Sequence, residues 1–398
     1  MRAVITSATS DAGSVAARCL RRAGFTVFGV DARRMPRILA SRHLDGYACV
    51  GHSDPRDRQD ATLEFVRRVR ADVLLPLCTP GAMLAAQRHH ELESLCRTCA
   101  PPMDAFLSAY DKRRCMEACR QMGIPCAGSL SRDEAADLLG RCGQSVIVKP
   151  AIDAGAARDI RDVATVDQLD DAVREVRLRH GECLIQERIP GDAGAMHMLT
   201  VVMGEASQVL AAFTARKLRH WPSTGGVTAY GVSTRRQDLL DRMLPLFNRW
   251  HWRGPAEVEL KRDPRDGQFK VIEVNPRLPG YIRLASACGL DLPAVAASAA
   301  LGAASDPSDG LSRYSEGVRY IAPTVFLKSV LAHARTCGLR VAIGGACRDA
   351  AQSGPMLCSL IKDPVPIIVR SVVPKRRCRS VSCAEFESGM RSRSAPDA

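Results

Sequence analysis

The sequence is poor in aromatic residues and has no long apolar run. Phe, Tyr and Trp make up 5% of its 398 residues, and the arginines are spread along the whole chain, so the basic stripe with interleaved aromatics that favours nucleic-acid binding is missing. No window of about 18 residues is free of charged and turn-forming residues, which argues against a membrane-spanning helix. The first residues lack the apolar core of a signal peptide. We expect a cytoplasmic protein that binds neither nucleic acids nor membranes.

The chain carries a formal net charge of +13 and sixteen cysteines. A solvated basic surface suits anionic substrates. The cysteines are scattered singly through apolar segments, unlike the dense framework of a small secreted domain, so we expect reduced core residues. His89, His90, Cys96 and Cys99 have a spacing that would suit zinc, but the same segment is typical of an amphipathic helix and its exit, which we favour.

Strands alternate with helices at the start of the chain. Short apolar runs at 2–6, 25–31 and 71–78 are separated by helical patterns, which predicts a parallel sheet with helices on both faces. Asp31 lies where the ribose-binding acid of a dinucleotide site would stand. The first loop, however, has one glycine where that fingerprint needs three, and Asp11 would oppose a pyrophosphate. We therefore predict a Rossmann-like fold without a nicotinamide cofactor, and an NAD(P)-dependent oxidoreductase remains a rival interpretation.

From about residue 111 the pattern changes. A helix leads to apolar strands at 145–150 and 183–191, and two further strands, at 198–204 and 207–220, are joined by a short turn, which predicts an antiparallel pair. Few helices separate these strands, which indicates an α+β unit. Beyond them the sequence predicts two helices and a last apolar strand, at 291–303, 323–338 and 364–370.

The most informative stretch is residues 255–280, where two apolar strands flank a D-P-R-D-G turn near Asp266 and predict a hairpin. In that hairpin Glu259 lies across from Glu273, and period-two alternation puts Asn275 on the same face. Like charges directly opposite each other destabilise a strand pair, and burial costs more unless a cation neutralises them. Mg²⁺ removes the conflict, because it typically takes one or two carboxylates plus substrate phosphates.

The alternative for this hairpin is an ordinary exposed turn. In that case solvent screens the charges, and Lys261 on the same face pairs with Glu259. The neighbouring motifs decide between the two interpretations. V-I-E-V-N-P-R at 271–277, with a glutamate fourteen positions upstream, resembles the metal-binding hairpin of ATP-grasp enzymes.

Other blocks follow in the order of that family: V-K-P at 148–150, a small-residue loop, I-Q-E-R-I-P-G at 185–191, Arg216-Lys217 and Gly225-Gly226. The match runs from the first strand to about residue 303. It is most similar to the branch of carbamoyl-phosphate-synthase-like and pyrrolysine-biosynthesis-like carboxylate–amine ligases.

The resemblance implies an α/β and α+β protein, in which an ATP-grasp fold follows an N-terminal Rossmann-like (pre-ATP-grasp) domain. The domains expected are a Rossmann-like domain at 1–110, an ATP-grasp domain at 111–305 (a small subdomain at about 120–190 and a metal-binding subdomain at about 191–305), a C-terminal accessory region at 306–374, and a basic, disordered tail at 375–398.

The resemblance also implies the nucleotide site. Lys149 would contact the α-phosphate and adenine, and Lys112 would reach the nucleotide from the edge between domains. Gln186, Glu187 and Ile189 match the linker where a carboxylate accepts the adenine amino group and backbone groups read the ring edge. An ordinary strand-end charge is the alternative for each ionisable residue of this set.

Metal and phosphoryl-transfer residues come from the hairpin. By the resemblance Glu259, Glu273 and Asn275 would hold two Mg²⁺ ions, with Mn²⁺ as a substitute, and Arg277 would stabilise the transferring phosphoryl group. Lys217 and Arg219 could clamp the triphosphate or the substrate carboxylate, or form a solvated basic strand end.

Two segments depart from the family pattern. The loop at 151–160 holds only Gly155, where relatives have several glycines and serines, so Arg158 would replace backbone contacts to the γ-phosphate. After I-P-G the family places a ribose-binding glutamate, a role that Asp192 or His197 would have to take. A catalytically silent nucleotide-binding module is therefore a second interpretation.

The activity that the resemblance implies is ATP-dependent amide formation. The γ-phosphoryl group of ATP would activate a carboxylate as an acyl phosphate, and an amine would then displace phosphate. An amino acid or a small peptide is the expected substrate and a homodimer the expected assembly. Bicarbonate is a further phosphoryl acceptor to consider within the same family.

Overall fold

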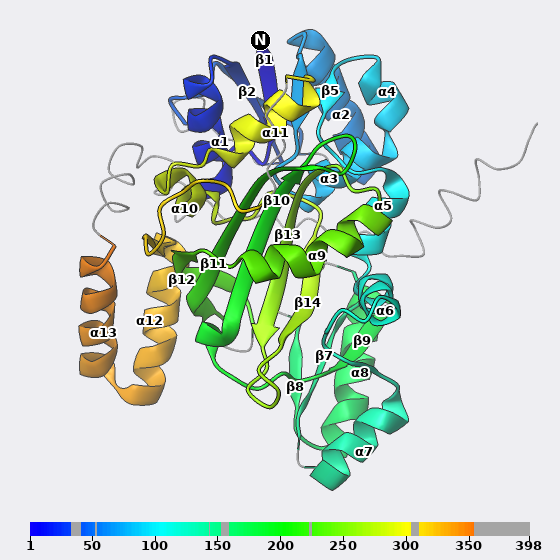
Figure 1. Cartoon of the computed structure of the whole chain (residues 1–398), viewed down its shortest axis with the longest axis vertical. Helices are drawn as coiled ribbons and strands as arrows, with labels where there is room; N and C mark the ends of the chain where they lie inside the picture. Colours follow the sequence, from blue (N-terminus) through cyan, green and yellow to red (C-terminus); the bar gives the residue numbers. More distant parts are fainter. Residues whose placement is uncertain are drawn as a thin grey trace, which may run out of the picture.

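The structure is a computed structural model of the chain, and it describes residues 1–32, 41–51, 54–142, 144–152, 159–222, 225–303 and 310–353. Three predicted features lie outside these ranges: Arg158, the strand at 364–370 and the tail at 375–398. Figure 1 shows the N-terminal sheet at one end, the large antiparallel sheet in the middle and a small sheet at the other end.

The N-terminal sheet is parallel, with strand order β3-β2-β1-β4-β5. Its strands are β1 (Arg2–Thr6), β2 (Thr26–Asp31), β3 (Gly46–Cys49), β4 (Val73–Leu75) and β5 (Arg97–Thr98). Its helices are α1 (Asp11–Arg22), α2 (Pro55–Arg68), α3 (Thr79–Gln87) and α4 (His89–Glu93). Ser10 begins α1, because its side chain accepts a hydrogen bond from the Gly13 amide. The predicted alternation of strands and helices is confirmed.

The central sheet is antiparallel, with order β14-β13-β10-β11-β12-β15. Its strands are β10 (Met196–Met203), β11 (Val209–Trp221), β12 (Val227–Thr234), β13 (Gly254–Arg262), β14 (Phe269–Asn275) and β15 (Arg319–Ile321). The predicted pairing of the strands around 198–204 and 207–220 is confirmed. The domain boundaries stay predictions, although β15 extends this sheet past residue 305.

Both faces of the central sheet are covered. One face packs in an apolar cluster with three helices, α5 (Met103–Tyr110), α6 (Lys112–Gln121) and α9 (Gln237–Arg249). The other face shares a cluster with the N-terminal sheet, α10 (Ile282–Ala287) and α11 (Leu292–Ala300). An ion pair between the partly exposed Asp11 and the buried Arg283 joins α1 to α10. The N-terminal and central sheets therefore share one core.

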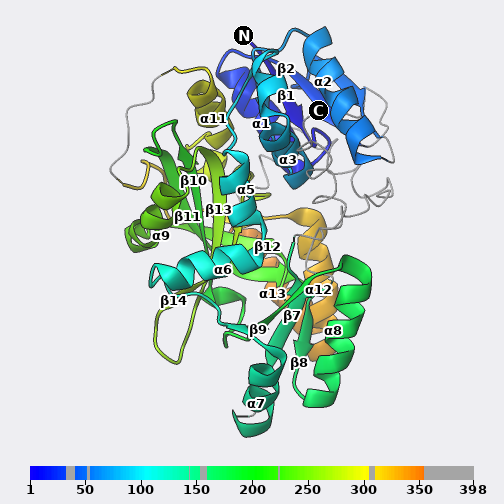
Figure 2. The ribbon, with the colours of Figure 1, turned by 90° about the vertical axis from the view of Figure 1, so that its right-hand side faces the viewer.

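The small sheet has its own core and lies beyond α6 (Figure 2). Its order is β6-β9-β7-β8. The strands are β6 (Ser129–Leu130), β7 (Val146–Pro150), β8 (Arg161–Val163) and β9 (Cys183–Glu187), and the helices are α7 (Arg132–Cys142) and α8 (Val166–His180). A short 3-10 turn, Ala193–Ala195, precedes β10.

Two helices follow the central sheet, α12 (Pro323–Cys337) and α13 (Leu339–Ala351). They form a hairpin beside β11 and β12 (Figure 1). The sequence predicted α12 but not α13. Within the described ranges no helix is long and apolar enough to cross a membrane.

Candidate active site

The β13–β14 hairpin places acidic side chains in pairs. Glu259 lies opposite Glu273, as predicted, and Glu257 lies opposite Asn275. The strand register shifts directly after Glu259, so the pairing of acidic and amide side chains does not continue beyond Glu259. The neighbours Val258 and Leu260 belong to the apolar cluster with α9, so strand alternation turns the carboxylates to the opposite face.

Lys217 of β11 neutralises Glu259. Its Nζ atom lies 2.7 Å from Glu259 Oε1 and also donates to the Gly226 carbonyl at 3.1 Å, and Lys217 is 2% exposed. A charged pair with so little solvent exposure is well screened from competing water. Lys261 lies opposite Lys270 in the hairpin, so the partner of Glu259 is Lys217 rather than the lysine of the exposed-turn alternative.

Two further lysines reach Glu273 from different elements. Lys112, the first residue of α6, has its Nζ atom 3.6 Å from Glu273 Oε2. Lys149 of β7 is buried and donates to the Ile272 carbonyl at 3.4 Å. Burial lowers the pKa of Lys149 to about 8, and the nearby Lys112 charge acts in the same direction. The small sheet thus contributes a desolvated ammonium beside the hairpin.

Glu257 is a site residue that the sequence analysis missed. It is 4% exposed, and Arg277 Nη1 lies 3.4 Å from its Oε2 atom. Asn275 Nδ2 donates toward Glu257 at 3.4 Å and toward Glu273 at 3.2 Å. Strand alternation could have identified it, because Glu257 precedes Glu259 by two positions and therefore lies on the same face of the strand.

The pKa values of two carboxyl groups on this face, Glu257 and Glu273, are shifted in opposite directions. Burial raises the pKa of Glu257, and the neighbouring Glu259 and Glu273 add to that effect against the opposing Arg277. Burial also acts to raise the pKa of Glu273, but Lys112 and Lys149 outweigh it and lower the pKa. One buried carboxyl group therefore resists ionisation, while another is held ionised.

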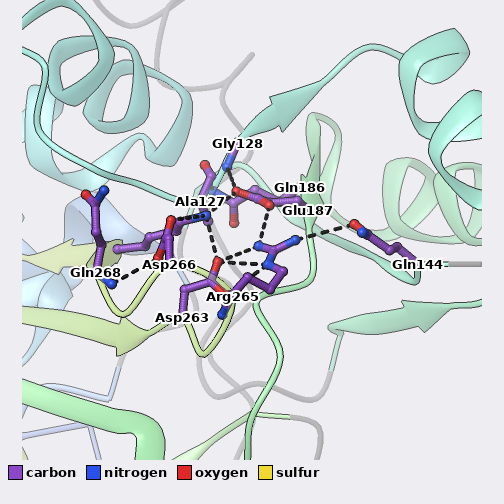
Figure 3. Close-up of polar contacts among 10 residues, drawn as sticks. Ala127, Gly128, Gln144, Gln186, Glu187, Asp263, Arg265, Asp266 and Gln268 are labelled. Carbon is purple, nitrogen blue, oxygen red and sulfur yellow. Dashed lines mark hydrogen bonds and ion pairs between the residues drawn. The ribbon is translucent and has the colours of Figure 1, made fainter. Parts of the chain in front are cut away.

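The residues assigned to adenine lie where β9 ends. Gln186 is buried and its Nε2 atom donates to the Ala127 carbonyl at 3.1 Å, and Ile189 is also buried. Glu187 Oε1 accepts from the Gly128 amide at 3.0 Å. Figure 3 shows that the Glu187 carboxylate also faces Arg265 of the hairpin turn.

Three predicted residues do not join the hairpin carboxylates. Arg219 pairs with Asp349 of α13, Nε to Oδ2, at 2.9 Å. Asp192 Oδ1 accepts from the Gly194 amide at 2.9 Å and so caps the 3-10 turn. His197 packs edge-on against Phe269, with ring centroids 4.9 Å apart. Its alternation with Met198, which pairs with Glu259, puts His197 on the face away from the carboxylates.

Asp31, the acid expected in the rival dinucleotide site, is already hydrogen-bonded within the chain. Thr9 donates to the Asp31 carboxylate through its amide at 3.0 Å and its hydroxyl at 2.6 Å. Asp11 pairs with Arg283. These carboxylates stabilise the loop and the contact between the sheets.

The rival zinc site is also not formed. No group of three or more His, Cys, Asp or Glu side chains with metal-site geometry occurs among the described residues. His89 Nε2 instead lies 3.1 Å from Glu93 Oε1 and 2.9 Å from Arg253 Nη2.

The hairpin residues fit Mg²⁺ by their chemistry. Glu259 and Glu273 supply carboxylate oxygens and Asn275 an amide oxygen, which are the ligands a hard cation prefers. Two carboxylates and an amide are too few to enclose the ion, which matches the habit of Mg²⁺ to complete its shell with water and phosphate oxygens.

Comparisons with known proteins bear on the fold. No family model matches the chain. Over 98 residues it is 28% identical to the D-aspartate ligase of Enterococcus faecium (strain Aus0004), a match that spans 24% of this chain and only 23% of that ligase.

Two solved structures cover most of the chain. The biotin carboxylase domain dimer of Hydrogenobacter thermophilus 2-oxoglutarate carboxylase, in complex with Mg·ADP, ADP and bicarbonate, aligns with a TM-score of 0.63 at 14% identity, over 80% of this chain and 73% of that chain. The L-amino acid ligase of Bacillus licheniformis aligns with a TM-score of 0.56 at 16% identity, over 77% of each chain. The chain therefore has the ATP-grasp fold, which confirms the α/β and α+β architecture predicted from its motifs.

Proposed function

We propose that the protein is an ATP-dependent ligase that joins a carboxylate to an amine, with release of ADP and phosphate. The observation that carries the proposal is the pairing of Glu259 with Glu273 on a strand face that Lys112, Lys149 and Lys217 also reach. Acidic oxygens suited to Mg²⁺ stand there beside ammonium groups suited to phosphate oxygens. Phosphoryl transfer from Mg·ATP needs both kinds of group close together.

Glu259, Glu273 and Asn275 are the residues that would hold Mg²⁺, as one ion or two, and Mn²⁺ would suit the same oxygens. When bound, the metal neutralises charge on the β- and γ-phosphates. The rest of the electrostatic stabilisation falls to the chain's own cations, because a preorganised positive charge in a water-poor site costs little reorganisation during the reaction.

The lysines have separate roles in this scheme. Lys149, whose pKa of about 8 leaves it mostly charged at neutral pH, binds the α-phosphate from the small sheet. Lys112 approaches from the start of α6, on the other side of Glu273. Lys217 fixes Glu259 and meets the γ-phosphate, since its ammonium has three donors and gives one to Glu259 and one to Gly226.

Arg277 would meet the developing acyl phosphate. Its Nη1 atom donates to the Leu278 carbonyl at 3.2 Å and lies 3.4 Å from Glu257, and its Nη2 atom lies 3.4 Å from Asn275, so the guanidinium is oriented by long contacts. A carboxylate substrate placed against this guanidinium would attack the γ-phosphorus, and the amine would then attack the acyl carbon and expel phosphate. Arg219, held by Asp349, would bind a second anionic group of the substrate.

An amino acid or a small peptide is the substrate class that we propose. Its support is the resemblance to an L-amino acid ligase across the fold and to a D-aspartate ligase over a short stretch. Bicarbonate is the second candidate acceptor, because the carboxylase neighbour was crystallised with bicarbonate. A homodimer is proposed on the same neighbour, which is a dimer.

The test is Mg²⁺-dependent ADP release by the purified protein over pools of amino acids and other carboxylates, with and without an amine pool, and with bicarbonate alone. Glu273→Gln is the site variant. Glu64→Gln is the matched control, because Glu64 lies on α2 with a side chain that is 66% exposed. Release that needs a carboxylate and an amine and is lost only in Glu273→Gln supports the ligase. Release with bicarbonate alone supports the carboxylase candidate, and Mg·ATP binding without any release supports a silent module.

A further inference from the structure

Two segments connect the small sheet to the rest of the molecule, and they are bonded to each other. Residues 125–128 lead from α6 into β6, and the chain leaves β9 at Glu187. The Glu187 amide donates to the Gly128 carbonyl at 2.9 Å, and the Gly128 amide donates to Glu187 Oε1 at 3.0 Å. The joint of the small sheet is thus one hydrogen-bonded unit.

This joint is also bonded to the outer strand of the central sheet. The Ala127 amide donates to the Val271 carbonyl at 3.0 Å, and the Val271 amide donates to the Pro125 carbonyl at 2.9 Å. Val271 lies on β14, two residues before Glu273. The joint and the carboxylate site are therefore built on the same strand.

Charged side chains at the turn of the β13–β14 hairpin contact the joint (Figure 3). Arg265 Nη2 lies 2.9 Å from Glu187 Oε2, and Lys270 Nζ lies 3.5 Å from Glu187 Oε1. Both cations also contact Asp263, which is fully buried: Arg265 Nε at 2.9 Å and Lys270 Nζ at 2.7 Å. Each oxygen of Glu187 therefore has a cation, and each cation has a second anchor in the turn.

The cluster contains more acidic than basic groups. Two cations meet the carboxylates of Glu187 and Asp263, and a third carboxylate, Asp266 at the exposed rim, lies 3.7 Å from Lys270. Arg265 and Lys270 hold the pKa of Asp263 well below its usual range. Gln144, two residues before β7 of the small sheet, accepts weakly from Arg265 at 3.4 Å. The guanidinium of Arg265 thus touches the turn, the joint and the small sheet together.

We propose that Arg265 and Lys270 are positioning residues, which lock the joint of the small sheet and hold the Glu187 carboxylate where it selects the base of the nucleotide. The proposal rests on the proposed function. A carboxylate only accepts hydrogen bonds, so a fixed Glu187 favours the amino group of adenine and disfavours the oxo group of guanine. Without its two cations Glu187 would regain its side-chain rotamers, and the small sheet would lose a tie to the hairpin.

The kinetic test compares single variants of the turn. For Arg265→Met we expect the KM for ATP to rise about 10-fold, kcat to change less than about twofold, and the preference for ATP over GTP to fall at least about fivefold. Lys270→Met should act in the same direction, and Arg265→Lys should restore part of the preference. Arg262→Met is the matched control, because Arg262 ends β13 directly before the same turn and is exposed, and within the described ranges its side chain makes only a long contact to the Gly267 carbonyl. A KM and a base preference within twofold of wild type in Arg265→Met would overturn the proposal.

A second readout does not depend on catalysis. Amide hydrogen exchange of the full chain without nucleotide should be at least about tenfold faster at residues 127–130 and 183–187 in Arg265→Met, while Arg262→Met matches wild type. Unchanged exchange would refute the lock whether or not the chain is a ligase. If wild type turns over no nucleotide, the proposed function fails, and faster exchange confined to these segments still supports the lock. If exchange rises over the whole chain, the contact only stabilises the fold, and the proposal is wrong.

Discussion

The two ends of the β13–β14 hairpin hold their charges in different ways. At the turn, opposite charges meet at hydrogen-bonding distance, 2.9 Å between Arg265 and Glu187 and 2.7 Å between Lys270 and Asp263. At the carboxylate end only the pair of Lys217 and Glu259 is that short. The others are looser, with 3.6 Å from Lys112 to Glu273 and 3.4 Å from Arg277 to Glu257.

This contrast separates a fixed carboxylate from open ones. Cations on both oxygens hold the Glu187 carboxylate in one direction, whereas the 3.6 Å contact between Lys112 and Glu273 is not a hydrogen bond and leaves both groups available. The pKa values agree with this distinction. Arg265 and Lys270 lower the pKa of Asp263, while at the other end burial raises the pKa of Glu257. The chain pairs its charges closely at the turn, whereas at the carboxylate end it does so only for Glu259 and leaves Glu257 and Glu273 with longer contacts.

The largest effect is expected at Glu273. Glu273→Gln removes one of two facing carboxylates and should lower kcat by a factor of about 10²–10³, the scale typical for loss of one preorganised electrostatic group. The folded state should also lose stability at neutral pH, because Lys112 and Lys149 lower the pKa of Glu273 in the folded state and its ionised form is therefore stabilising. Steady-state ADP release, together with urea unfolding, measures both quantities. A variant with kcat near wild type would place the chemistry elsewhere.

The next effect is expected at the turn. Asp263→Asn leaves Arg265 and Lys270 without their buried counter-charge, and we expect the free energy of unfolding to fall by about 2–3 kcal/mol, below the range for fully buried pairs because Arg265 is a third exposed. Chemical denaturation is the measurement. Asp266→Asn, at the exposed rim of the same turn, is the control and should change stability by less than about 0.5 kcal/mol. Equal losses in the two variants would contradict the role of burial.

Lys149 predicts a pH effect. Its folded pKa of about 8 lies below the ordinary value of 10.5, so between these values the unfolded chain binds more protons and stability rises with pH. Relative to Lys149→Met, the wild type should therefore gain about 1–3 kcal/mol in unfolding free energy between pH 8 and pH 10.5. Denaturation of both proteins across this range is the test. A flat difference would mean that Lys149 is solvated in the folded state.

The smallest effect is expected at Lys261. It faces Lys270 in the hairpin rather than Glu259, so Lys261→Met should change kcat and KM by less than about twofold. Lys217→Met, which removes the ammonium that Glu259 contacts, should lower kcat/KM by at least about 10². Parallel kinetics of the two variants provide the comparison. A large loss in Lys261→Met would revive the exposed-turn interpretation.

Much of the fold was predictable because it depends on local chemistry. The D-P-R-D-G turn fixes the register of the hairpin, and with it the pairing of Glu259 and Glu273, and a slip of one residue would turn Val258 out of the core. The helix α13 was missed because its L-R-V-A-I-G-G-A segment contains two adjacent glycines, which disfavour a helix, and its partner α12 supplies the packing instead.

The site was predictable only in part, because its partners are far apart in the chain. Lys217 and Glu259 are separated by 42 positions, and Arg265 and Glu187 by 78. No local pattern encodes such pairs, so the sequence suggested Lys261 as the partner of Glu259. Asp192 and His197 were considered for the ribose from their place in the motif alone. The side chain of His197 instead packs against Phe269, on the far face.

The most direct test of the central claim is product analysis after incubation of the protein with Mg·ATP and pooled carboxylates and amines. We predict a new amide in the mass spectrum, formed in a one-to-one ratio with ADP, absent without Mg²⁺ and absent in Glu273→Gln. ADP formation with no amide, or an amide formed equally well by Glu273→Gln, would contradict the assignment of the hairpin carboxylates to a carboxylate–amine ligase.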